Sequence, residues 1–567
     1  MYVKVTRSGP RRYVQLVESF RNEEGKVKQR TIATLGRLDQ MDSALESVIA
    51  GLMKVTGREA PAPAAAPSVA FESARALGDI WALQELWHSL GFSALGRIFG
   101  KTRHVIDVEA LIRVMVFNRL CDPESKLGVL RWLETVAFPG LDAATVSHDH
   151  LLRAMDALAD HQAAVETVVA QQLCPLIDQD LSVVFYDLTT IRAEGLSEQD
   201  KDVRQFGMAK EGLIARQFML GIVQTADGLP LYHQVFEGNT GETTTLLPTI
   251  TTVLARYPSI RRVILIADRG LLSLDNLDAL RAIQLNGGRP LEFILAVPGR
   301  RYYEFAELLQ PFQKDHCQEA KEEIVGEAKW QDLRLVMAHN PHQATEQTKK
   351  RQELIQSLLD QAQQWVGKLD AQDAGKTGRG RKLSDSGAKA RFYRAVSEAH
   401  LSRIIKVDLK AELFAYEIDE TAQTLAEMMD GKLLLVTNTA DLTAEEVVGR
   451  YKSLADIERG FRVLKSELQI GPVYHRLPER IRAHACLCFI ALILYRVMRM
   501  RLKAAKSPDS PERALAGLRR IQQHRIRLNG ETPIEGISTI TDEHARIFQA
   551  LGLKKPTAAS CQQLSFL

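Results

Sequence analysis

The 567-residue chain has few cysteines, no long hydrophobic run and almost no net charge. Its six cysteines form no CxxC pair, which argues against a disulfide framework and against a structural zinc site. We find no secretory signal pattern and expect a reducing, cytoplasmic location. The most apolar run, residues 485–495, is about half as long as a bilayer requires, so we expect a buried helix and no membrane partner.

Charge of one sign is also lacking. The 73 lysines and arginines and the 70 aspartates and glutamates leave a net charge of +3, and the hydrophobic content of 45% is that of an ordinary globular protein. A nucleic-acid partner would therefore have to be bound by local clusters of basic residues. A Walker A phosphate loop is missing too, because Asp370 stands where the GlyLysThr sequence at 375–377 would require a glycine.

Changes in hydrophobic pattern divide the chain into seven segments. In order they are a small β-rich unit (1–60), a linker rich in proline and alanine (61–70), a helical candidate DNA-binding region (71–178), an α/β segment (179–298), a mainly β segment with one helix and a basic loop at 375–387 (299–440), two helices (441–502) and a helical tail (503–567).

The α/β segment predicts the order β-β-β-α-β-α-β. The expected strands are 181–191, 216–225, 229–237, 261–270 and 292–298, and the expected helices are 242–257 and 273–285. Apolar residues surround an aspartate at two of these strand ends: the first strand ends near Asp187 and the fourth ends on Asp268. Aspartate is common after strands, so neither residue indicates a site by itself.

One long helix is predicted over 443–468, because its apolar residues recur at threes and fours and it contains no proline. Tyr451, Glu458 and Lys465 are seven residues apart, so on one helix they would lie within ~20° of the same face and about 10 Å apart along the axis. A solvated helix face explains this spacing equally well. A functional interpretation of Glu458 requires carboxylate partners elsewhere.

Asp187 and Asp268 could be those partners of Glu458. Two-metal phosphoryl transfer requires clustered carboxylates, because two Mg²⁺ ions ~3.5–4 Å apart need hard oxygen ligands. An aspartate from each of two strands and a glutamate from a helix packed on the sheet satisfy this geometry. We therefore predict that these three residues are catalytic and bind two Mg²⁺ ions, for which Mn²⁺ could substitute.

The order of these elements resembles the ribonuclease-H-like catalytic core of DDE transposases. The resemblance implies an α/β fold in which residues 179–298 and 441–502 form a mixed-sheet core, interrupted by an insertion domain over 299–440. The predicted helix is similar to the Tyr-Arg-Glu-Lys signature of the insertion-sequence-four superfamily, except that Leu454 replaces the arginine. The phosphate contact expected there must then be absent or supplied by Arg459 or Arg462.

Further motifs resemble one branch of that superfamily, the sixteen-thirty-four branch. They are TyrAspLeuThrThr around Asp187, PheGluGlyAsnThr at 236–240, AlaAspArgGly around Asp268, and PheArgValLeuLysSer and ValTyrHisArg after Glu458. The resemblance covers nearly the whole chain. It implies an enzyme that acts on double-stranded DNA, both terminal inverted repeats and target, as a homodimer associated with a bacterial-type nucleoid. The DNA-binding candidates are Tyr451, Lys465, Arg462, Arg459 and Arg269.

Two rival functions remain open at this point. A catalytically silent relic could still bind element ends, although the presence of all three carboxylates argues against it. A metal-dependent nuclease on the same fold would cleave DNA without joining a 3′ end to a target.

Two other features have simpler interpretations. His148 and His150 resemble a metal-binding pair, but they stand at the start of a helix, where capping explains them better. Trp330 or Trp365 could stack on a DNA base, but a tryptophan in an ordinary core is the commoner case.

Overall fold

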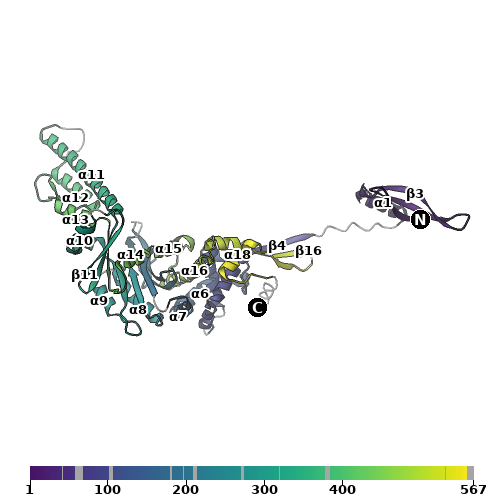
Figure 1. Ribbon diagram of the computed structural model, residues 1–567, viewed down its shortest axis with the longest axis horizontal. Helices are drawn as coiled ribbons and strands as arrows, with labels where there is room; N and C mark the ends of the chain where they lie inside the picture. Colours follow the sequence, from purple (N-terminus) through teal and green to yellow (C-terminus); the bar gives the residue numbers. More distant parts are fainter. Residues whose placement is uncertain are drawn as a thin grey trace. The chain divides into compact units, whose positions relative to one another are not determined.

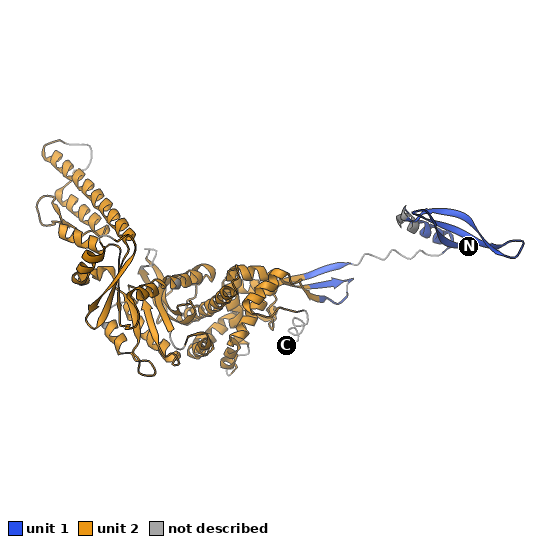
Figure 2. Ribbon diagram, in the orientation of Figure 1, with its two compact units in different colours: residues 1–72, 525–534 blue, residues 73–524, 535–567 orange. Residues whose placement is uncertain are grey.

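The computed structural model describes residues 1–40, 42–57, 68–100, 106–178, 182–195, 197–208, 214–269, 274–317, 320–376, 383–529 and 531–557. These residues form two compact units: unit 1 comprises residues 1–72 and 525–534, and unit 2 comprises residues 73–524 and 535–567 (Figure 2). Most of the predicted linker at 61–70 and the centre of the predicted basic loop at 375–387 lie outside the described residues.

Unit 1 contains a three-stranded antiparallel sheet in the order β1-β2-β3. Its strands are β1 (Tyr2–Ser8), β2 (Arg11–Arg21) and β3 (Val27–Arg37), followed by helix α1 (Asp42–Val55). The central strand β2 carries the buried valines Val14 and Val17, while most of the side chains of β1 and β3 are exposed. The predicted strands are therefore present in this unit, and α1 is an element that the sequence pattern did not predict.

Unit 2 is built on a nine-stranded mixed sheet in the order β11-β12-β15-β10-β9-β5-β7-β6, with β8 also paired to β7. Its central strands are β8 (Pro230–Glu237), β7 (Ile214–Thr225), β5 (Ser182–Arg192), β9 (Val263–Ala267) and β10 (Glu292–Ala296). β5, β9 and β10 run parallel, and β7 and β8 are antiparallel to their neighbours. All five residues of β9 are buried, as expected of a strand covered on both faces.

Five strands and two helices of the predicted series are thus present, with α8 (Leu246–Arg256) and α9 (Leu274–Ala282) as the helices (Figure 1). β6 (Gln205–Met208) is an additional short strand. β5 does not end near Asp187 but continues to Arg192, because its second half remains paired with β7 after the pairing with β9 has stopped.

The prediction of a single helix over 443–468 is wrong. The structure has α14 (Ala444–Lys452), then α15 (Ala455–Arg462) and a π-helical turn over Val463–Glu467. At the joint, Leu454 and Ile457 each donate a backbone hydrogen bond to the carbonyl three residues earlier, 2.9 Å away. This tighter turn changes the helix phase, and Leu454 is buried there.

α14 and α15 lie over different strands of the sheet. α14 packs against β9, β11 and β12, whereas α15 packs against β5. α15 can come close to the core because Gly460 has no side chain: a Cβ there would lie 3.1 Å from both Arg496 and Gln224. The broken helix therefore brings Tyr451 over one strand of the sheet and Glu458 over another.

The helical prediction for 71–178 agrees with α2 (Gly78–Ser89), α4 (Val108–Cys121), α5 (Lys126–Thr135), α6 (His148–Asp160) and α7 (Gln162–Leu173). The long helix α16 (Pro478–Ala504) packs against α4, α6 and β8, so it connects these helices to the sheet (Figure 1). Among the described residues α16 is the one helix that is long and apolar enough to cross a bilayer, but 94% of its apolar window is buried inside the protein. It is a core helix.

The segment 299–440 differs from the mainly β prediction. Its strands β11 (Ile324–Trp330) and β12 (Leu333–His339) extend the main sheet, followed by β15 (Lys432–Thr437). The rest of its described residues are mainly helical, with α11 (Pro341–Asp373) and α12 (Asp385–Glu398) packed together (Figure 1). Two further strands, β13 (Ile405–Val407) and β14 (Tyr416–Ile418), form a small two-stranded ribbon beside a second core between these helices.

Both tryptophans of this segment belong to cores. Trp330 packs against Phe305, and Trp365 packs against Phe392 and Phe414 in the second core. The tail also differs from the helical prediction. α17 (Pro511–Leu518) and α18 (Asp542–Leu551) are present, but β16 (Gln522–Leu528) lies between β17 (Ile534–Ile537) and β4 (Val69–Ala76) in a small three-stranded sheet.

Candidate active site

Asp187 on β5 and Asp268, the residue directly after β9, continue the register of two neighbouring parallel strands. The last paired residues of β5 and β9 are Tyr186 and Ala267, so the next step of the same register places Asp187 beside Asp268. Adjacent strands are about 4.8 Å apart, and residues at the same level of parallel strands leave the sheet on the same face. Both aspartates are partly buried, whereas Tyr186 and Ala267 below them are fully buried.

Asp268 is held by Tyr451. The Tyr451 hydroxyl donates a 2.8 Å hydrogen bond to Oδ1 of Asp268. Burial, together with the Asp268 charge, raises the pKa of Tyr451 above its usual value, and Arg269 opposes this shift only in part. The phenol therefore keeps its proton and acts as the donor to the Asp268 carboxyl oxygen.

A hollow opens beside Asp187 along β5. It has a volume of about 380 Å³ and is lined by Thr189 and Thr190 of β5 and by Gly238, Asn239 and Glu242. Gly238 and Asn239 belong to the PheGluGlyAsnThr motif at 236–240. Gly238 has to be a glycine, because a Cβ there would lie 2.0 Å from the carbonyl oxygen of Gln217. The motif therefore shapes the wall next to the first aspartate.

Glu458 and the basic residues of its helix face solvent. Glu458, Arg459, Arg462 and Lys465 are all exposed, while Ile457 and Phe461 of the same turns are buried. Arg459, Arg462 and Lys465 are three residues apart, so they follow one face of the helical segment. This arrangement leaves the three cations accessible to a polyanion.

The three predicted carboxylates are only partly assembled. Asp187 and Asp268 are brought together by the sheet, but within the described residues no group of three His, Cys, Asp or Glu side chains is placed to hold a metal ion. The chemistry of the two aspartates suits a divalent cation, which prefers hard oxygen ligands. The two aspartates therefore fit the implied divalent ion. Glu458 lies on α15, which packs against β5, the strand that carries Asp187.

One buried ionic cluster near the sheet edge has no counterpart in the sequence prediction. Asp202 accepts hydrogen bonds from Arg204 (2.9 Å) and Arg216 (3.0 Å), and Arg204 is only 1% exposed. Their spacing of two and fourteen residues gives no recognisable motif, so only the tertiary structure identifies it. It anchors the loop after β5.

One of the two histidines at the start of α6, His150, takes part in the helix cap. Ser147 and His150 form a capping box, with the Ser147 hydroxyl accepting from the His150 backbone N–H at 3.2 Å. The capping interpretation is therefore confirmed for His150.

Two protein-family profiles match the chain. The family described as IS1634 family transposase, N-terminal domain, matches residues 3–65, and the family described as Transposase DDE domain matches residues 178–494. The second match covers more than half of the chain and includes β5, β9, α14 and α15. No curated protein matches the sequence.

Proposed function

Because this chain belongs to the DDE transposases, in their IS1634 branch, we propose that it binds the terminal inverted repeats of an insertion sequence, hydrolyses the DNA at the element ends and joins the freed 3′ ends to target DNA. The main support is the β5–β9 register, which brings Asp187 beside Asp268 inside the matched domain. Transposition on DNA is the function of the family; the steps and residue roles below belong to the proposal.

Asp187, Asp268 and Glu458 are proposed as the ligands of two divalent ions, Mg²⁺ or Mn²⁺. Bound there, the ions would supply Lewis acidity to the attacking oxygen and to the leaving oxygen of a phosphodiester. Asp187 and Asp268 provide their oxygens from rigid strands. Glu458 provides the third carboxylate from α15, which is short and is bounded by the joint at Leu454 and the π-helical turn.

The remaining site residues position the carboxylates and the DNA. Tyr451 orients the Asp268 carboxylate through its 2.8 Å hydrogen bond. Arg459, Arg462 and Lys465 are exposed beside Glu458 and offer cations to backbone phosphates, and Arg269 offers another next to Asp268. Because Leu454 is buried, we assign the phosphate contact of the missing signature arginine to Arg459 or Arg462.

A homodimer is part of the proposal, because cleavage and joining of two element ends require two active sites held together. Unit 1 is proposed to contribute to end recognition, and its exposed basic residues on β1 to β3 support this role.

The test uses DNA that carries the sequences flanking the gene. Wild-type protein is incubated with it in Mg²⁺, with and without EDTA, and the variants Asp187→Asn, Asp268→Asn and Glu458→Gln are compared. We expect each variant to lose more cleavage than the roughly 10–100-fold lost when an outer partner of a metal ligand is removed. The matched controls are Asp227→Asn, in the exposed β7–β8 turn, and Glu445→Gln, exposed on α14.

The outcomes separate the rival functions. Wild-type cleavage by one of the three variants removes that residue from the proposed site. Cleavage without joining of the 3′ end to a target plasmid identifies a nuclease. Binding to the ends without cleavage in either Mg²⁺ or Mn²⁺ identifies a silent relic.

A further inference from the structure

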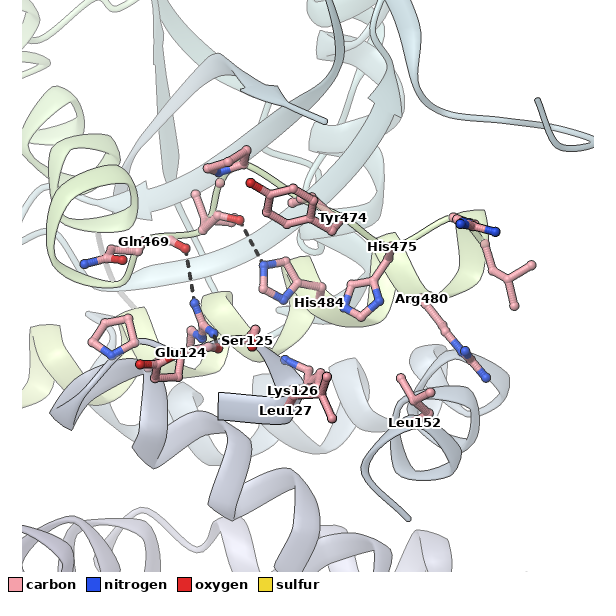
Figure 3. Close-up of a pocket in the computed structure, with 18 of the residues that line it drawn as sticks. Glu124, Ser125, Lys126, Leu127, Leu152, Gln469, Tyr474, His475, Arg480 and His484 are labelled. Carbon is pink, nitrogen blue, oxygen red and sulfur yellow. Dashed lines mark hydrogen bonds between the residues drawn. The ribbon is translucent and has the colours of Figure 1, made fainter. Parts of the chain in front are cut away.

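A second cavity, of about 710 Å³, lies outside the carboxylate site (Figure 3). We call it the Lys126 cavity. It is enclosed by the loop that leads into α5, the first turns of α6 and α16, and the segment 469–477 that follows the Glu458 helix. This last segment contains the ValTyrHisArg motif at 473–476, for which the proposed chemistry has no use.

Three helices begin at the wall of the Lys126 cavity. α5 begins at Lys126 after its N-cap Ser125, α6 begins at His148, and α16 begins at Pro478. Helix N-termini carry a partial positive charge and unpaired backbone N–H groups. The N-cap of α16, Leu477, provides no side-chain acceptor, so the first-turn amides of this 27-residue helix have no cap from it. All three helix dipoles favour a negative charge in the cavity.

Lys126 is the independent sign of a ligand. Its side chain lines the cavity and is only 7% exposed, yet no described residue gives its ammonium a hydrogen bond or an ion pair (Figure 3). A buried ammonium without an acceptor is costly. Burial, and then the charge of Arg119, lower the pKa of Lys126 to about 7. An anion in the cavity would offset both effects.

The other polar groups of the cavity leave the charge of Lys126 uncompensated. His475 and His484 lie close together, with their ring centroids 5.7 Å apart, and burial lowers the pKa of His475 to about 3. His484 Nε2 donates to the Ile470 carbonyl at 2.9 Å, and its buried Nδ1 has no partner among the described residues. Glu124 is the one carboxylate among the described lining residues, and its side chain lies over Gly128.

The Lys126 cavity is connected to the carboxylate site through β5. Val473 donates a backbone hydrogen bond to the Arg192 carbonyl at 3.0 Å, and Glu194 donates one to the Val473 carbonyl at 2.8 Å. Asp187 and Ala193 are six residues apart on this extended chain, which at 3.3 Å per residue is about 20 Å.

We propose that the Lys126 cavity binds a phosphate group of the DNA backbone, remote from the reacting phosphodiester, between the ammonium of Lys126 and the N-terminus of α16. The inference rests on the proposed function, because that function supplies DNA as the ligand. A phosphate fits the site by charge, and its oxygens can accept from the ammonium and from helix N–H groups together. Such a contact positions the duplex without reading its sequence.

The test compares Lys126→Met, which keeps the apolar stem, with Lys126→Arg, which keeps the charge. The control is Lys503→Met, an exposed lysine at the opposite end of α16. Binding of a fluorescent 30-base-pair duplex of arbitrary sequence is followed by anisotropy between about 50 and 200 mM salt. We expect Lys126→Met to bind about tenfold more weakly and to reduce the salt slope by about one, and Lys126→Arg and Lys503→Met to stay near wild type.

Inorganic phosphate is the second probe, and the melting temperature of each variant is measured with and without it. Stabilisation of wild type but not of Lys126→Met by phosphate, together with weaker DNA binding, supports the inference. Loss of the phosphate effect with unchanged DNA binding overturns it in favour of a small free anion, and no change with either probe overturns it outright. If Lys126→Met fails to fold, then failure of Lys126→Arg to bind DNA at the wild-type level overturns it.

The two proposals can fail separately. If the wild-type protein cleaves DNA in Mg²⁺ but Lys126→Met binds DNA as tightly as wild type, the proposed function stands and this inference is overturned. If DNA binding depends on Lys126 but the wild-type protein cleaves no DNA, the proposed catalytic function is overturned and the phosphate contact stands.

Discussion

At the scale of single residues, one hydrogen bond from Tyr451 links α14 to Asp268 at the end of β9. Its hydroxyl donates to Asp268, and burial with the nearby Asp268 charge raises its pKa, so it remains a donor under ordinary conditions. Its role as a DNA contact stays a prediction. Its role as the residue that orients Asp268 follows from the geometry, because removal of the hydroxyl leaves a partly buried carboxylate without this donor.

We therefore predict that Tyr451→Phe reduces Mg²⁺-dependent cleavage by roughly 10–100-fold, the loss typical of an outer partner of a metal ligand. The loss should be smaller at saturating Mg²⁺ if the hydroxyl mainly orients a ligand. The measurement is the cleavage rate as a function of Mg²⁺ concentration, with the exposed tyrosine variant Tyr393→Phe, on α12, as the control. Equal rates for Tyr451→Phe and wild type at every concentration would contradict the assignment.

A second residue-scale prediction concerns Asp202. Burial works against its charge, but hydrogen bonds from Arg204 and the charge of Arg216 lower its pKa overall. Replacing it with asparagine leaves Arg204 buried beside a neutral group, so we expect Asp202→Asn to reduce the free energy of unfolding by about 3–5 kcal/mol.

The pairing of Asp202 with Arg204 also predicts that the free energy of unfolding depends on pH. A carboxyl with a lowered folded-state pKa stabilises the fold above its unfolded pKa of about 3.9, and this contribution is lost as pH falls through the folded-state pKa. The stability difference between wild type and Asp202→Asn should therefore be largest near neutral pH and narrow in acid. Urea titrations at a series of pH values measure it, and a difference that grows in acid would refute the pairing.

At the scale of the element, the joint between α14 and α15 decides what the Glu458 helix can reach. Leu454 fills this joint and is 9% exposed, in contact with the main core. An uninterrupted helix would have kept Tyr451 and Glu458 on one line. Because the helix is interrupted, α14 instead packs over β9 and α15 packs over β5. Each helix therefore contacts a strand that leads to one of the two aspartates.

We predict that Leu454→Ala destabilises unit 2 by about 2–5 kcal/mol, as expected for removal of a buried leucine. The exposed Leu413→Ala should change stability by less than about 0.5 kcal/mol. Tryptophan fluorescence during urea unfolding measures both, since all five tryptophans lie in unit 2. If the two variants unfold at the same urea concentration, the joint does not carry the packing assigned to Leu454.

At the scale of the whole molecule, the chain is two compact units, and both hydrophobic core clusters of the described residues lie in unit 2. Unit 2 holds the nine-stranded sheet, the helical region and every residue proposed for catalysis, whereas β1 to β3 form a sheet of their own in unit 1. The two family matches follow the same division, since one begins at residue 3 and the other at residue 178.

We predict that a chain beginning at residue 68 keeps the urea transition of unit 2, because the core of that unit contains no residue from 1–57. The shortened chain should lose its preference for element-end DNA over arbitrary DNA if unit 1 contributes to end recognition. Tryptophan fluorescence checks the first expectation and competition binding checks the second. A lowered unfolding midpoint would show that unit 1 supports the fold of unit 2.

The sequence by itself determined the chain of elements that makes the site. The local pattern predicts buried strands of valine, isoleucine and leucine that lead to Asp187 and Asp268. It also predicts an amphipathic helix with Glu458. Both predictions are possible because hydrophobic period is a property of neighbouring residues. The same local pattern identified α16 as a buried helix and His150 as part of a cap.

Only the tertiary structure decided how these elements meet. The register that sets Asp187 beside Asp268, the Tyr451 contact to Asp268, the break at Leu454 and the gathering of three helix N-termini around Lys126 all join residues far apart in the chain. None of them leaves a periodic trace in the sequence, because the packing of one surface on another selects them. For the same reason the segment 299–440 was predicted as mainly β and folds mainly as helices: its short apolar runs cover a core that only the folded chain creates.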